Sequence, residues 1–275
     1  MGALVGRYAG RIRQARFALN GKVVSLSANA GGHCLHGGET GFADRVWSLE
    51  AIAEAEDQRF RFMLDSEDGD QGFPGALSVI AEYRWHPAGR LSLQIDAVSG
   101  APTPVCVSQH LYWNLGGAAE PDIARHLLQV RASHYLPLAP DGVPTGEIRP
   151  VAGTPFELRT PVPLGERLSC GDPAIVAAGG FDHCWCADGT GLREVAVLHH
   201  PPSGRTMHVW SDQPGLQIYT GNTLDVAPAG KAGRPMARHA GIALETQNYP
   251  DAPNQPSFPD PILRPGQRWR SQTVF

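Results

Sequence analysis

The 275-residue sequence contains very little lysine and no run of basic residues. Its formal net charge is −4 at pH 7, and charged residues make up only 18% of the chain. Nucleic acids and anionic membranes attract clustered positive charge, so we expect neither as a partner. No segment has the roughly 18 consecutive apolar residues of a membrane-spanning helix. Glycine-rich nucleotide-binding motifs and the G-x-S-x-G nucleophile elbow are missing too, which argues against nucleotide and serine-hydrolase chemistry.

Cysteine is also scarce, with five residues at irregular spacing. An odd, irregular set predicts no disulfide framework and favours a reducing cytoplasm, and the first seven residues lack the apolar core of a secretory signal. Two short segments, 33–36 and 182–186, contain histidine close to cysteine. A closed zinc site needs four ligands in a recognisable spacing, which neither segment supplies. We therefore expect no metal and no other cofactor.

Helical periodicity is limited to single turns near 121–125 and 172–177. Short segments of strand character fill the rest, separated by 32 glycines and 24 prolines spread along the chain. Asn20-Gly21 supplies the two positive φ angles of a type I′ turn and predicts a hairpin of 16–19 with 22–26. We expect further strands at 46–55, 58–64, 77–85, 90–98, 195–199, 206–210, 216–220, 240–244 and 268–275. These features predict an all-β fold, a single large antiparallel β-sandwich domain spanning residues 1–275.

Four residues stand out as candidates for chemistry, and each has an ordinary alternative. Glu245 follows a short apolar strand, where burial would raise its pKa and suit it as a base; it would otherwise be a salt-bridged strand end. His36 precedes Gly37-Gly38 and points either into a pocket or to solvent. His110 lies beside aromatic and amide residues that suit a sugar, or is a core histidine. Asp182 binds a ligand hydroxyl or caps its own loop.

Eight sequence stretches in this order resemble the aldose 1-epimerase (galactose mutarotase) family. They are Gly6-Arg7-Tyr8-Ala9-Gly10-Arg11-Ile12, Leu35-His36-Gly37-Gly38, Gly41-Phe42-Ala43-Asp44-Arg45-Val46-Trp47, Gln71-Gly72-Phe73-Pro74-Gly75, His110-Leu111-Tyr112-Trp113-Asn114-Leu115, Phe181-Asp182-His183, Tyr219-Thr220-Gly221-Asn222 and the segment from Leu244 to Asn254. They cover nearly the whole chain, which makes the resemblance specific although each stretch alone is modest.

The resemblance implies an isomerase that interconverts the α and β anomers of a free aldose without metal or cofactor. It implies that Glu245 is the general base, that His110 is the general acid, and that His36 is a second imidazole near the ring oxygen. The same resemblance assigns sugar hydroxyls to Arg11 and Asp182. It assigns the shape of the pocket to Asn222 and Gln247.

Two departures from the family pattern have consequences. Gly10 stands where family members usually carry Asn, which removes one polar contact near the sugar. The chain also begins almost at its first motif, so either the true start lies upstream or the sandwich is N-terminally short. In the second case a missing strand pair would expose a sheet edge, and we expect a homodimer that covers it. One alternative function is a non-catalytic sugar-binding or sensing protein on the same fold. Another is a hydrolase or lyase that pairs Asp182 with Glu245.

Overall fold

A computed structural model of the chain describes residues 2–53, 58–118, 120–226 and 235–275. Its strands form two large sheets and four two-stranded ones, and every pair of named strands is antiparallel. The prediction of an all-β antiparallel fold is therefore confirmed. None of the described helices is long and apolar enough to cross a membrane.

The smaller of the two large sheets has six strands and carries the segment around Glu245. In order across the sheet its strands are β12 (Tyr112–Trp113), β21 (Ile242–Gln247), β20 (Gly215–Tyr219), β17 (Asp182–Ala187), β14 (Ala132–Leu136) and β15 (Arg149–Pro150). Every residue of β21 is buried.

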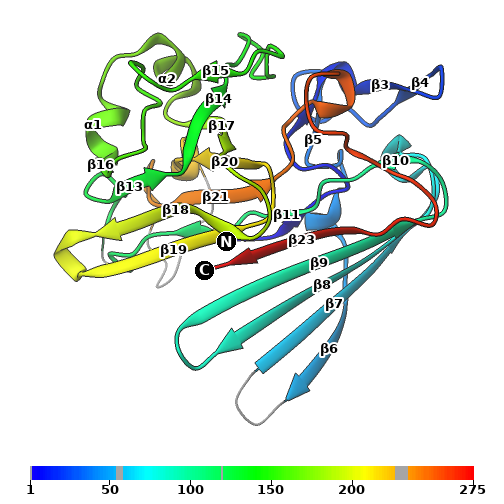
Figure 1. Ribbon diagram of the computed structural model, residues 1–275, viewed down its shortest axis with the longest axis horizontal. Helices are drawn as coiled ribbons and strands as arrows, with labels where there is room; N and C mark the ends of the chain where they lie inside the picture. The colour runs from blue at the N-terminus through cyan, green and yellow to red at the C-terminus, as the bar shows by residue number, and fades with distance from the viewer. Residues whose placement is uncertain (1, 54–57, 119, 227–234) are drawn as a thin grey trace.

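The larger sheet has nine strands, and its members β6 to β9 extend away from the rest of the molecule toward the lower right of Figure 1. In order they are β16 (Val162–Pro163), β13 (Leu127–Val130), β18 (Arg193–His200), β19 (Arg205–Ser211), β23 (Trp269–Val274), β9 (Arg90–Ser99), β8 (Leu77–His86), β7 (Gln58–Ser66) and β6 (Ser48–Ala53).

Short elements connect and flank these sheets. The two-stranded sheets pair β1 (Leu4–Val5) with β11 (Ser108–Gln109), β2 (Arg11–Ile12) with β5 (Cys34–Leu35), β3 (Arg16–Leu19) with β4 (Lys22–Ser25), and β10 (Thr103–Pro104) with β22 (Ile262–Leu263). The α-helices are α1 (Leu164–Leu168) and α2 (Pro173–Ala178), and the 3-10 turns are η1 (Arg13–Ala15), η2 (Phe42–Asp44), η3 (Asp70–Gly72), η4 (Pro201–Ser203), η5 (Leu224–Val226) and η7 (Ala252–Asn254).

The six-stranded sheet has one face in the main core and one facing the N-terminal segment. Because side chains alternate along a strand, Leu244 and Ile218 point to the core face, where they pack with Trp185 and with residues of β13 and β18. The opposite face carries Cys184 and Cys186, which pack with the N-terminal motif in a second buried cluster. This opposite face also carries the polar residues described below.

The hairpin predictions are confirmed. Asn20 and Gly21 have φ angles of 51° and 74° between β3 and β4, as a type I′ turn requires. The strands predicted at 77–85, 90–98, 195–199 and 206–210 are observed as β8, β9, β18 and β19, each slightly longer than predicted, and they pair as β8–β9 and β18–β19. The strand predicted at 46–55 is observed as β6, and its last two residues lie outside the described part of the chain.

Two sequence-based predictions are corrected, and one helix was not predicted. No helix forms at 121–125, because the Asp122 carboxylate accepts a hydrogen bond from the Ala124 N–H and closes a turn there instead. Helix α2 forms where expected, capped by Asp172, but α1 was not predicted. The strand predicted at 240–244 is Ile242–Gln247 in the structure, because β20 pairs with residues 243–247 and β12 pairs with Ile242. Glu245 therefore lies within a strand and not at its end.

Candidate active site

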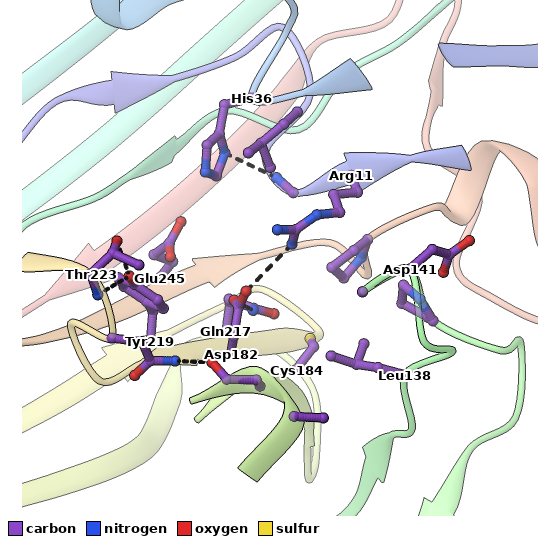
Figure 2. A pocket seen from close by; sticks show the side chains of 18 of the residues that line it. Arg11, His36, Leu138, Asp141, Asp182, Cys184, Gln217, Tyr219, Thr223 and Glu245 are labelled. Atoms are coloured by element: carbon purple, nitrogen blue, oxygen red, sulfur yellow. Dashed lines mark hydrogen bonds and ion pairs between the residues drawn. The ribbon is translucent and has the colours of Figure 1, made fainter. Parts of the chain in front are cut away.

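A cavity of about 500 Å³ opens on the polar face of the six-stranded sheet. Side chains from distant parts of the chain line it, and Figure 2 shows how they converge. The lining residues are Gly10, Arg11, Leu35, His36, His110, Leu138, Pro140, Asp141, Gly142, Pro144, Ala177, Ala178, Asp182, Cys184, Gln217, Tyr219, Asn222, Thr223, Glu245 and Pro250. Its volume lies within the range typical of small-molecule sites.

Strand register explains how the floor of this cavity forms. Gln217 of β20 lies opposite Glu245 of β21, and Cys184 of β17 lies opposite Gln217 on its other side. Residues opposite one another in neighbouring strands share a face, so these three side chains form one row across the sheet. The next row, two residues along, contains Asp182 and Tyr219.

The Glu245 side chain is only 2% exposed. Burial raises the pKa of its carboxyl group to about 7; His110 opposes this shift and Asp182 adds to it. Its Oε2 atom has no hydrogen-bond partner in the described part of the protein. A carboxylate with a pKa near neutrality and a free oxygen in a cavity is suited to accept and return a proton at pH 7.

His110 directly follows β11 and brings an imidazole to Glu245. Its Nε2 atom lies 3.4 Å from Oε1 of Glu245. The ring also lies 5.0 Å from that of Tyr112 and 6.2 Å from that of Tyr219, measured between centroids. The Nδ1 atom is buried and has no partner among the described residues. The imidazole of His110 and the carboxyl group of Glu245 are therefore adjacent in the cavity lining. The sequence left open whether His110 is a core or a pocket residue, and the structure places it in the pocket.

His36 is a second imidazole in the cavity, 5.6 Å from the ring of His110 and nearly perpendicular to it. The Gly10 N–H donates a hydrogen bond to Nδ1 of His36 over 3.2 Å. Burial, followed by the proximity of His110 and Arg11, lowers the pKa of His36 to about 3. His36 is therefore neutral near pH 7, and with Nδ1 accepting, its proton resides on Nε2.

The glycine pair after His36 serves the protein's own backbone and not a ligand. Gly37 has a φ of +96°, and a Cβ atom there would collide with the carbonyl oxygen of Gly6. The close approach at Gly37 is thus between two segments of the protein's own backbone. It fixes the turn that carries His36, whose side chain lines the cavity (Figure 2).

Arg11 and Asp182 point toward one another in the cavity lining and form an ion pair (Figure 2). The Nη1 atom of Arg11 lies 3.4 Å from Oδ2 of Asp182, and Nε2 of Gln217 donates to Oδ1 of Asp182 over 2.7 Å. Both charged side chains are about a quarter exposed, which leaves them accessible to a ligand. The neighbouring residue His183 points to the core face, where burial lowers its pKa to about 4.

Of the two residues to which the resemblance assigns the shape of the pocket, Asn222 lines the cavity and Gln247 does not. Asn222 lines the cavity, but its amide donates to the Ala178 and Phe181 carbonyls and accepts from Thr220, so it holds a loop. Gln247 is fully buried and does not line the cavity.

Gly10, the departure noted in the sequence, lies above Gln247. A Cβ atom at Gly10 would sit 3.4 Å from Nε2 of Gln247 and 3.0 Å from the ring of Pro250. Neither polar atom of the Gln247 amide has a partner among the described residues. The substitution to Asn would therefore need Pro250 to shift, and would bring a polar group near the Gln247 amide.

Sequence reasoning missed Gln217, Tyr219 and Thr223 as cavity residues. A signal for two of them was present, because alternation along the predicted strand 216–220 places Gln217 and Tyr219 together on the face opposite Leu216 and Ile218. The third residue, Thr223, follows the strand, and its hydroxyl forms a hydrogen bond of 3.0 Å with the hydroxyl of Tyr219. The alternation pattern of a strand does not extend to such a turn, so the sequence did not predict this contact.

Within the described ranges, one group of side chains could offer three ligand atoms to a metal ion. His36, His110 and Glu245 place such atoms within 4.8 Å of one another. Two of these groups, Glu245 and His110, also suit proton transfer without an ion, since a carboxyl group and an imidazole can each donate and accept protons. The paired carboxylates of a glycosidase provide a weaker match, because Asp182 is engaged by Arg11 and Gln217.

Comparison with known proteins identifies the family. Residues 1–275 match the family model described as aldose 1-epimerase. The chain is 40% identical to human galactose mutarotase over 275 residues, which is all of this chain and 78% of that protein. It is 37% identical to the aldose 1-epimerase of Escherichia coli (strain K12) over 280 residues, covering 100% of this chain and 79% of that protein.

A solved structure extends the match to three dimensions. The GalM/aldose epimerase homologue from C. elegans superposes with a TM-score of 0.88 at 27% sequence identity, covering 98% of this chain and 80% of that one. Sequence and fold thus agree with the residues gathered in the cavity: the chain belongs to the aldose 1-epimerase family and is an isomerase of aldoses.

Proposed function

We propose that this aldose 1-epimerase works by acid–base catalysis with Glu245 as base and His110 as acid. The observation that carries the proposal is the 3.4 Å distance between Nε2 of His110 and Oε1 of Glu245 in a cavity that a second, neutral imidazole also lines. Hexoses, galactose among them, are the proposed substrates, in keeping with the name of the human relative.

The reaction opens and recloses a pyranose ring. Glu245 takes the proton of the C1 hydroxyl while His110 gives a proton to the ring oxygen, so that the C1–O5 bond breaks as the C1 carbonyl forms. Rotation about C1–C2 presents the other face of that carbonyl. On reclosure His110 takes back the proton of the C5 hydroxyl and Glu245 returns its proton to the C1 oxygen. Both groups end as they began, which requires pKa values not far from neutrality.

The other polar groups bind and orient the sugar. We assign to His36 a hydrogen bond from its Nε2–H to the ring oxygen, since its low pKa suits a donor that does not itself ionise. Arg11 and Asp182 would hold hydroxyls away from the anomeric carbon. Gln217, which orients Asp182, belongs to the same set. Asn222 and Gln247 would shape the pocket only indirectly, from the loop and from beneath Gly10.

Polarimetry tests these roles directly. Freshly dissolved α-D-galactose or α-D-glucose should equilibrate faster with the protein than without it. Glu245→Gln keeps the shape but removes the base, and His110→Asn removes the acid; each should lower kcat by about 10²- to 10⁴-fold. An unchanged rate for Glu245→Gln would refute the assignment. A protein that binds sugar without accelerating equilibration would instead be a binding protein.

We also propose that residues 1–275 act as one domain in a reducing compartment, the cytoplasm. The cavity draws on residues from Gly10 to Pro250, and all five cysteines are unpaired. The expected homodimer is retained as a proposal, with the outer edge of β6 as the contact, because β6 ends the nine-stranded sheet. A sedimentation experiment that finds a monomer at all concentrations would contradict the dimer.

A further inference from the structure

We infer that Gln109 is a positioning residue, whose buried side-chain amide ties the backbone at His110 to the backbone at Glu245 and so fixes the distance between the two reacting groups. Nothing in the resemblance or in the cavity points to this residue, because it does not line the cavity. The inference rests on the proposed function of the pair that Gln109 holds.

The contacts of Gln109 single it out. Its Nε2 atom donates to the carbonyl oxygen of Leu244 over 2.7 Å, and its Oε1 atom accepts from the N–H of Leu111 over 2.8 Å. The first carbonyl belongs to the peptide unit that leads into Glu245. The second N–H belongs to the peptide unit that follows His110. One amide group therefore bridges the two peptide units that adjoin the proposed base and acid.

This bridge joins segments that are 135 residues apart in the sequence. Gln109 is only 1% exposed and Leu244 is fully buried, so water does not replace either bond easily. A backbone hydrogen bond fixes the peptide unit that precedes His110, because the His110 N–H donates to the carbonyl oxygen of Ala3 over 2.8 Å. The backbone of His110 is thus fixed on both sides, by β1 with its flanking residue and by the Gln109 amide.

Only a carboxamide of this length satisfies the bridge. It offers a donor and an acceptor at once, whereas a carboxylate cannot donate and a thioether does neither adequately. The geometry is also sensitive, since the distance from Nε2 of His110 to Oε1 of Glu245 is already 3.4 Å. Displacements of about 1 Å in catalytic geometry can cost on the order of 10²-fold in rate.

The neighbouring residue Ser108 supplies a matched control. Its hydroxyl donates to the carbonyl oxygen of Thr246 over 3.0 Å, so it also links β11 to β21 by a buried side-chain bond. It also reaches the carbonyl oxygen of Gln109 over a longer 3.4 Å, but it makes no bond to the peptide unit at 110–111 in the described part of the chain. Ser108→Ala therefore removes a link between the same two strands and leaves in place both bonds of the Gln109 side-chain amide.

The test compares Gln109→Met, Gln109→Asn and Ser108→Ala with the native protein. Polarimetry gives kcat and KM, thermal unfolding gives Tm, and calorimetry gives the affinity for 1,5-anhydro-D-galactitol, a sugar that lacks the anomeric hydroxyl and does not react. We expect Gln109→Met to lower kcat by about 10- to 100-fold with the affinity within about threefold. Gln109→Asn, whose amide is one methylene shorter, should fall between this variant and the native protein. Ser108→Ala should keep kcat within about twofold even where its Tm falls.

Three outcomes would overturn the inference. One is a kcat for Gln109→Met within twofold of the native value. Another is an equal loss of kcat in Ser108→Ala, which would indicate general loosening of the strands. The third is a loss of affinity that matches the loss of kcat. If Gln109→Met does not fold, Gln109→Asn decides the question by the same criteria. Glu245→Gln, measured alongside, separates this inference from the proposed function: if Glu245→Gln is inactive and Gln109→Met is fully active, only the role of Gln109 is refuted.

Discussion

The two faces of the six-stranded sheet are made from the same strands and have opposite characters. On the core face, Ile218 and Leu244 are fully buried among apolar side chains. On the cavity face, two residues from the same strands, Gln217 and Glu245, are buried as well, yet each has a polar oxygen without a hydrogen-bond partner in the described part of the chain. A strand can therefore stabilise the fold with one set of residues while the alternate set works against stability.

The difference indicates how the site is maintained. An unpaired buried polar atom costs free energy, roughly 1 to 3 kcal/mol each. The core face has to offset that cost, which it does through apolar burial on adjacent positions of the same backbone. Alternate residues of β20 and β21 therefore serve the two purposes, with those on one face stabilising the fold and those on the other lining the site. This separation can be tested.

The largest expected effect on stability comes from the core face. Ile218→Ala should lower the free energy of unfolding by about 2 to 5 kcal/mol, because it removes buried methyl groups and leaves a cavity. Its kcat, measured well below Tm, should stay within a few-fold of the native value, since the side chain points away from the site. Urea denaturation with polarimetry checks both quantities. A loss of kcat comparable to that of Glu245→Gln would show that the two faces are not separable.

A smaller effect is expected on the cavity face, where the substitution Glu245→Gln should stabilise the fold above neutral pH. The folded pKa of Glu245 is about 7 against 4.5 for the ordinary group. Between these values the folded protein holds the proton that the unfolded chain has lost, so ionisation destabilises the fold as pH rises through this window. Relative to Glu245→Gln, the native protein should lose about 2 to 3 kcal/mol of unfolding free energy between pH 5 and pH 8. Parallel denaturation curves at the two pH values measure this; a constant difference would contradict the raised pKa.

The smallest effect concerns the pH dependence of activity. A base must be ionised, so kcat/KM of the native enzyme should fall as pH drops below about 7. Asp182 helps to raise the pKa of Glu245, so Asp182→Asn should move this acidic limb to lower pH by a fraction of a unit. The variant should also lose kcat/KM at every pH, through weaker sugar binding. If the acidic side of the kcat/KM profile stays in place or moves to higher pH, the fall in activity reflects the ionisation of a group other than Glu245.

Much of the fold could be predicted from local signals. Asn20-Gly21 determines its hairpin because both residues tolerate positive φ, and alternation in 77–85 and 90–98 is visible without any partner strand. The extent of β21 could not be predicted, because Glu245 and Gln247 are polar and only pairing with β20 makes them part of a buried strand.

The candidate site residues could be predicted from the sequence only where they lie in the stretches that resemble the aldose 1-epimerase family. Glu245, His110, His36, Arg11, Asp182 and Asn222 all line one cavity, which residue spacing alone could not establish. Gln247 lies outside it, because the residue two positions after Glu245 shares its face but is covered by Gly10 and Pro250. The role proposed for Gln109 is invisible in the sequence, since it depends on a contact over 135 residues.

The contact of Gly37 with Gly6 limits how this enzyme can diverge. Substrate preference can drift by exchange of the side chains around the sugar, and many such exchanges would be tolerated. Position 37 has no such freedom, since the smallest added group meets the backbone of the N-terminal motif at a positive φ. Descendants of this sequence can therefore change which aldose they prefer, while position 37 must remain glycine.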